Sequence, residues 1–155
     1  MELTSQDIKI LALLQHNADL SSSDVAHELN MSQSPAWRRI KRLEEANIIT
    51  KKVAVLNRKA LGMELVAFTT INLSAAGRKN MELFEHAVSQ LDEVVECYTM
   101  TGAWDYMLKV VVKSIGHYEQ FVRNRLLEVP MIGEVHSHIS VTEIKNTSEL
   151  PLRQL

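Results

Sequence analysis

The residues that could do chemistry in this chain of 155 residues gather in one basic segment. Between Gln33 and Lys52, six lysines and arginines stand against two glutamates, a local balance of +4, although the whole chain has a net charge of −2. Arginine can make paired hydrogen bonds to guanine in the major groove of DNA, and further basic side chains hold phosphates. The segment therefore favours DNA as a partner.

The basic residues lie in a predicted helix that begins after Ser32. Counted at 100° per residue, Ala36, Ile40 and Leu43 share its core face, so the other side is free. Ser32 is the expected cap, where free N–H groups can bind a phosphate. The candidate DNA-binding residues are Ser32, Gln33, Ser34, Trp37, Arg38, Lys41, Arg42 and Lys51.

Structural roles compete with DNA contacts at several of these positions. A basic helix face can simply be solvated, and a single Trp such as Trp37 more often packs against its neighbours. Arg39 lies near the core edge, where it could form an ion pair with Glu44 or Asp24. The surrounding helices shift the interpretation toward DNA.

Two shorter helices are expected before the basic one. Thr4 and Ser21 are predicted N-caps, and each is followed three residues later by an aspartate, Asp7 or Asp24, as in a capping box. Three helices with a tight turn before the basic third one form a helix-turn-helix, whose last helix enters the major groove. Residues 48–56 predict a short strand or wing after it.

From residue 64 the pattern changes to alternating strands and helices. The order is strand-helix-strand-strand-helix-strand, which is the βαββαβ arrangement of ferredoxin-like domains, so the fold class is α+β. The predicted strands are 65–73, 94–101, 105–112 and 134–144, and the predicted helices are 81–91 and 118–126.

The sequence thus predicts that the chain has two parts with different functions. Residues 1–60 carry a charge of +2 and residues 61–155 a charge of −4. The predicted parts are a winged helix-turn-helix at 1–52, a linker at 53–63, the βαββαβ domain at 64–145 and a tail at 146–155.

Several classes of protein are excluded. Cys97 is the single cysteine, which rules out an intramolecular disulfide. Its place on an apolar strand predicts a small core residue, and the alternative is a sensing thiol. We find no nucleotide-binding glycine motif, no zinc-protease motif and no nucleophile elbow, so no enzyme activity and no cofactor are expected. No apolar stretch is long enough to cross a membrane, and no leader is recognised, so the expected location is the cytoplasm.

The motifs together resemble the Lrp/AsnC (leucine-responsive and asparagine regulator) family of transcription factors. They are Asp7-x-x-Ile10-Leu11, the run SPAWRRIKRLE at 34–44, TGAWDY at 101–106 and EIKNTSELP at 143–151. The resemblance implies a winged helix-turn-helix joined to a RAM-type βαββαβ domain that dimerises and senses amino acids. Such dimers often assemble into octamers and bind pseudo-palindromic operators.

The resemblance also places an effector between subunits, near the loop joining the second and third strands and near the last strand. Gly102 would let the backbone approach a ligand, and Asp105 could accept hydrogen bonds from an α-ammonium group. The competing interpretation is a hairpin turn at Gly102 that Asp105 caps. The candidate effector-binding residues are Gly102, Ala103, Trp104, Asp105, Tyr106, His136, Ser137 and His138.

The sequence therefore predicts an amino-acid-responsive, DNA-binding regulator that acts as a homo-oligomer on double-stranded DNA, with no membrane partner. One alternative is a nucleoid-type architectural protein that binds DNA with little sequence preference. A second is a regulatory subunit that tunes a metabolic enzyme, although that role leaves the basic helix unexplained.

Overall fold

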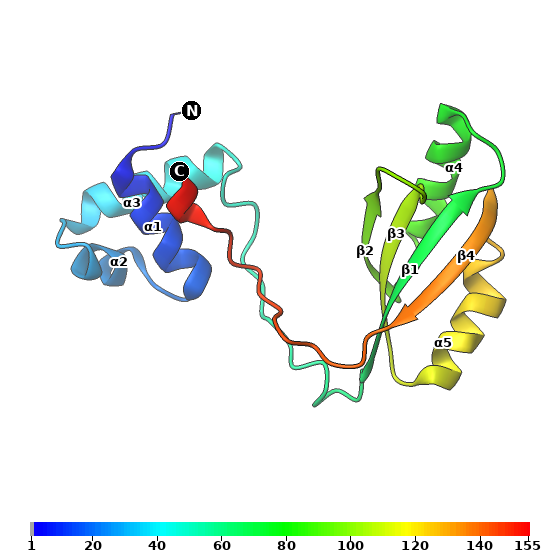
Figure 1. Ribbon diagram of the computed structural model, residues 1–155. Coiled ribbons are helices and arrows are strands. Elements are labelled where there is room, and N and C mark those ends of the chain that lie inside the picture. The colour runs from blue at the N-terminus through cyan, green and yellow to red at the C-terminus, as the bar shows by residue number, and fades with distance from the viewer. Residues whose placement is uncertain (1) are drawn as a thin grey trace. The chain divides into compact units, whose positions relative to one another are not determined.

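The computed structural model describes residues 2–155 and divides into two compact units (Figure 1). The first unit contains the N-terminal part of the chain up to Val55 together with residues 145–155, and the second contains residues 56–144. The C-terminal segment is thus part of the first unit.

The first unit consists of three helices, α1 (Ser5–His16), α2 (Ser22–Glu28) and α3 (Gln33–Glu45). Both predicted capping boxes are confirmed. The Thr4 hydroxyl accepts a hydrogen bond from the backbone N–H of Asp7, whose carboxylate accepts one in return, and the same exchange starts α2. Ser32 occupies the predicted N-cap of α3, but its hydroxyl makes no capping hydrogen bond within the described chain.

The core of the first unit follows the helical period that the sequence predicts. Ala36 and Leu43 of α3 are fully buried, and Ile40 is nearly so. They pack with residues of α1 and α2, chiefly Ile10, Leu14 and Val25. The expected wing strand is not formed, since residues 50–57 have neither helix nor strand.

The second unit is the predicted βαββαβ domain. Its four strands form one antiparallel sheet in the order β2-β3-β1-β4, as expected for a ferredoxin-like fold. Its elements are β1 (Leu65–Leu73), α4 (Arg78–Val88), β2 (Val94–Thr99), β3 (Tyr106–Val112), α5 (Ile115–Phe121) and β4 (Ile132–Ile139).

Helices cover one face of this sheet, and Figure 1 shows α4 and α5 beside the strands. Inward-facing residues of β1 and β3 form the core with Phe84, Tyr118 and Phe121. The Tyr118 hydroxyl lies 2.7 Å from that of Thr69 and donates to that of Ser137 over 2.6 Å, which ties α5 to β1 and β4.

The opposite side, here called the open sheet face, bears the alternate side chains of the strands. The pairing places Phe68 of β1 beside His138 of β4 and Lys109 of β3. Phe68 is 38% exposed. The members of this face are Phe68, Thr70, Glu96, Tyr98, Met107, Lys109, His136 and His138.

Three expectations for the second unit are wrong in detail. The helix predicted at 118–126 begins at Ile115 and reaches Leu126, but its last part, Val122–Leu126, is a single π-helical turn. The last strand ends at Ile139 instead of residue 144. Cys97 is exposed, because it lies on β2 at the edge of the sheet.

None of the helices within residues 2–155 is long and apolar enough to cross a membrane.

Candidate DNA-binding surface and effector site

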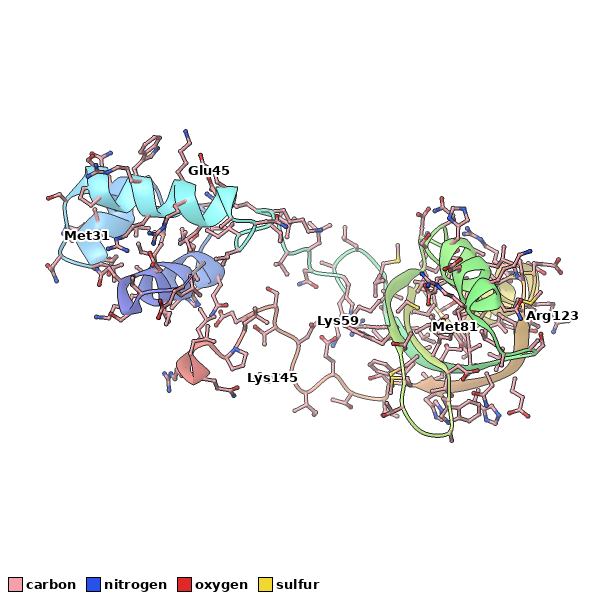
Figure 2. All side chains as sticks on the ribbon, turned by 90° about the horizontal axis from the view of Figure 1, so that it is seen from above. Met31, Glu45, Lys59, Met81, Arg123 and Lys145 are labelled. Atoms are coloured by element: carbon pink, nitrogen blue, oxygen red, sulfur yellow. The ribbon has the colours of Figure 1, made fainter. Side chains whose placement is uncertain are left out.

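The eight candidate DNA-binding residues are all exposed on the first unit. Figure 2 shows α3 between the labelled Met31 and Glu45, with side chains projecting away from α1. The Lys41 ammonium lies 5.1 Å from the centre of the Trp37 ring and 3.9 Å from the Glu45 carboxylate. Trp37 is 52% exposed, so it is not a core residue, and it supports Lys41 on the same face.

The arginines of α3 divide into two groups. Arg38 is exposed, whereas Arg39 and Arg42 reach back to α1. Nη1 of Arg39 donates to Oδ1 of Asp7 over 2.9 Å, and Nη2 of Arg42 donates to Oδ2 over 2.8 Å. The prediction that Arg39 pairs with Glu44 or Asp24 is therefore wrong. Glu44 instead lies 3.7 Å from the Lys52 ammonium.

Asp7 is the buried centre of this network, with a side chain that is 0% exposed. Burial by itself raises the pKa of the carboxyl group. Hydrogen bonds from the Thr4 hydroxyl and backbone N–H and from Arg39, together with the charge of Arg42, outweigh burial and lower the pKa from 3.8 to about 2. The charged form of Asp7 thus holds the recognition helix against α1.

The sequence identifies Asp7 as a capping residue and as part of a family motif, but not as the partner of the two arginines. The signal that was available is the coincidence of an aspartate in the first turn of α1 with two arginines on one side of α3. Arg42 keeps 47% of its side chain exposed, so part of its guanidinium remains accessible to solvent while one nitrogen is paired with Asp7.

Among the candidate effector residues, the structure brings Trp104 and His136 together. Their ring centres lie 4.4 Å apart at an angle of 55°. Trp104 belongs to the loop between β2 and β3, and His136 lies on β4 with its side chain on the open sheet face. Gly102 in the same loop has φ of +105°, a conformation that side chains other than glycine rarely adopt.

The Asp105 carboxylate already has a backbone partner. Its Oδ2 accepts the N–H of Leu73 over 2.8 Å, and its own N–H donates to the Asn72 side chain and to the Ile71 carbonyl, both over 3.0 Å. The Asp105 carboxylate thus ties this loop to the end of β1, and the hairpin itself is closed by the backbone, where the Met100 N–H donates to the Asp105 carbonyl over 2.8 Å. The side chain is exposed, so a carboxylate oxygen remains within reach of solvent.

Two other candidates face the helices instead. Tyr106 is 1% exposed, and its hydroxyl donates to Glu85 over 2.7 Å. Burial and this hydrogen bond raise the pKa of Tyr106 far above its ordinary range. Ser137 lies on the same side, bonded to Tyr118, while His136 and His138 lie on the other. The candidate set is therefore distributed over both faces of the sheet.

Comparison with known proteins places both units in one family. Residues 66–150 match the family model of the Lrp/AsnC ligand-binding domain, and residues 3–50 match that of a winged helix-turn-helix DNA-binding domain. The chain belongs to the Lrp/AsnC family. It is a DNA-binding transcriptional regulator with an effector-binding domain, and not an enzyme.

Individual Lrp/AsnC relatives match over nearly their whole length. The transcriptional regulator AzlB of Bacillus subtilis is 35% identical over 99% of this chain and 98% of its own, and the activator DecR of Escherichia coli is 34% identical over 94% and 96%. A crystal structure of a Neisseria meningitidis regulator in complex with L-Met superimposes with a TM-score of 0.94 at 31% identity, covering 99% of both chains.

We predict that Asp7→Asn destabilises the first unit, because Arg39 and Arg42 then lose their charged partner. A pKa lowered from 3.8 to about 2 corresponds to about 2 kcal/mol of stability. That contribution is fully present above about pH 4 and is lost as the pH falls toward 2. Urea unfolding between pH 7 and 2, followed by Trp37 fluorescence in a Trp104→Phe background, measures it.

Asp24→Asn is the matched control, since Asp24 caps α2 in the same way but is exposed and its hydrogen bonds come from Ser21 alone. We expect a smaller loss for this variant. Equal losses in the free energy of unfolding for both variants would contradict the role of the arginines. A difference in that free energy between wild type and Asp7→Asn that does not change with pH would contradict it too.

Proposed function

We propose that this regulator reads a pseudo-palindromic operator as a homodimer and responds to an amino acid bound by its C-terminal domain. The observation that carries the proposal is the division of α3: two arginines are tied to Asp7, whereas Arg38 and Lys41 lie on the exposed face. Lys41 lies there beside the exposed Trp37 and Glu45 of the same helix. As a DNA-binding regulator it would act in the cytoplasm.

In this proposal Arg38 reads a base and the other basic groups position the helix. A guanidinium projecting from the middle of a recognition helix matches the paired acceptors of guanine. Lys41, Arg42 and Lys51 contact phosphates, and the uncapped start of α3 at Ser32–Ser34 offers N–H groups to one more.

The amino-acid class of effector is supported by the L-Met complex of the meningococcal relative and by the ligand-binding family model. In this chain the ligand would lie near the loop 102–105 and the histidines of β4. Trp104 and His136 would supply an apolar and aromatic contact, and the Asp105 carboxylate could face an ammonium group.

A second copy of the chain is the occupant we propose for the open sheet face. An operator with two related halves requires two related helices, and a twofold interface uses the same surface on both copies. Lys109 and Glu96 on this face are already paired over 2.8 Å, so two identical faces can meet without two unpaired like charges. The buried Thr70 hydroxyl, which finds no partner within the described chain, faces the same way.

For the DNA contacts, we predict that Arg38→Ala costs about 1–3 kcal/mol on the preferred site and relaxes sequence preference at one position of each half-site. Lys41→Ala should weaken binding to all sequences alike and lower the salt dependence by about one unit. Fluorescence anisotropy on single-base variants of a site selected from random duplexes measures both. An Arg38→Ala protein with wild-type preferences would overturn the assignment.

For the dimer, we predict that Phe68→Lys raises the dissociation constant about tenfold or more, because a twofold interface would bring two added charges together. Ile115→Lys is the matched control, since Ile115 is an apolar residue that is 62% exposed on α5. Analytical ultracentrifugation gives both constants, and circular dichroism checks folding. Equal dissociation constants would remove the open sheet face from the proposal.

The function itself is tested by adding each L-amino acid, methionine first, to the protein and its selected duplex. We expect at least one to change the affinity by about 5-fold to 150-fold, the usual range of allosteric coupling. A random duplex serves as the control. Equal affinity for selected and random DNA would favour the architectural alternative, and no response to any amino acid would reject the proposed effector class.

A further inference from the structure

The C-terminal segment packs on the DNA-binding unit, although the chain reaches it only after completing the second unit. Residues 145–155 cluster with the helices α1–α3. Figure 1 shows the C-terminus beside α1, and Figure 2 labels Lys145 where the segment begins. Neither the family models nor the motifs assign a role to this packing.

The contact is made by the last turn of α1. The side-chain amide of Gln15 behaves like a peptide group toward Leu150: its Nε2 donates to the Leu150 carbonyl over 3.1 Å, and its Oε1 accepts the Leu150 N–H over 3.0 Å. One residue further on, Nδ1 of His16 lies 3.1 Å from the Glu149 carboxylate. We call residues 147–152 the C-terminal clasp.

The clasp has local order that favours this docking. The Thr147 hydroxyl accepts the N–H of Glu149, and Pro151 fixes the backbone before a single 3-10 turn at Leu152–Gln154. Beside the clasp lies a cleft of about 430 Å³, lined mainly by apolar residues of α1 and of segment 48–55 and by Leu150 and Leu152.

The docking is also shallow. Leu150 remains 67% exposed, and the side chains of His16 and Glu149 are 80% and 45% exposed. Two hydrogen bonds and an exposed ion pair hold a segment much less firmly than a buried core does. The clasp can therefore open without unfolding either unit.

The path of the chain connects the clasp directly to β4 of the second unit. The chain passes between the two units twice, at residues 55–56 and 144–145. The second passage follows β4, the strand that carries His136 and His138, after residues 140–144, which form no helix or strand. When the clasp is docked, two chain segments connect the DNA-binding unit to the second unit. Two connections restrict the range of orientations of the DNA-binding unit more than one connection does.

We propose that the C-terminal clasp is an intramolecular ligand of the DNA-binding unit and that its docking on Gln15 transmits the state of β4 to that unit. This inference rests on the proposed function, since it gives the route by which an amino acid near β4 alters DNA binding. It requires that the ligand changes the docked fraction of the clasp.

Docking is tested first, on the full chain without DNA or ligand, by hydrogen-exchange mass spectrometry of the C-terminal peptide. In wild type we expect protection at Leu150. Gln15→Ala should speed this exchange about tenfold, because it removes two hydrogen bonds, and Gln15→Glu should do the same, because it repels the Leu150 carbonyl and Glu149. Arg153→Ala, an exposed position in the same segment, is the control and should exchange like wild type.

Transmission is tested by the affinity for the selected duplex with and without the amino acid that gives the largest wild-type response. We expect Gln15→Ala to reduce that response several-fold, and Arg153→Ala to preserve it. Unprotected Leu150 in wild type, or an undiminished response in Gln15→Ala, would overturn the clasp. A wild type that responds to no amino acid would instead reject both the proposed effector and its transmission, while the exchange data would still decide the docking.

Discussion

The arrangement of the DNA-binding unit depends on one buried carboxylate. Asp7 starts α1 through Thr4 and accepts bonds from two arginines of α3, with its side chain fully enclosed. Removing one partner of a buried ion pair lowers the free energy of unfolding strongly, because a charge is left buried without a partner. Replacing the whole pair by apolar side chains often changes that free energy little. The network therefore specifies how α3 lies on α1 more than it adds stability, and it determines which arginines of α3 are paired with Asp7.

In the second unit the corresponding constraint is the alternation of side chains along four strands. One set of residues makes the core with α4 and α5, and the other set makes the open sheet face. The same alternation separates Ser137, which is bonded to Tyr118, from His136, whose ring lies against that of Trp104 at a tilted angle. A ligand on the open side can reach the loop 102–105 and the two histidines, whereas Tyr106 is part of the core.

The features that the sequence predicted well are those encoded within a few residues. The capping boxes at Thr4 and Ser21 and the core face of α3 depend only on local spacing. The partner of Arg39 lies 32 positions away and that of Gln15 lies 135 positions away, so local patterns carry little information about them. The last strand ends at Ile139, opposite Ala67 of β1, and beyond it the N–H of Ser140 still bonds to the Val66 carbonyl.

Helix α1 joins these observations into one chain of contacts. Its first turn holds the recognition helix through Asp7, and its last turn holds the clasp through Gln15. Its 12 residues form a regular helix of about 18 Å, so both contacts belong to one continuous element. Under the proposed mechanism, a change at the clasp would act on the element to which Arg39 and Arg42 are anchored, so opening the clasp would alter the presentation of α3 while the exposed Arg38 and Lys41 stay chemically unchanged.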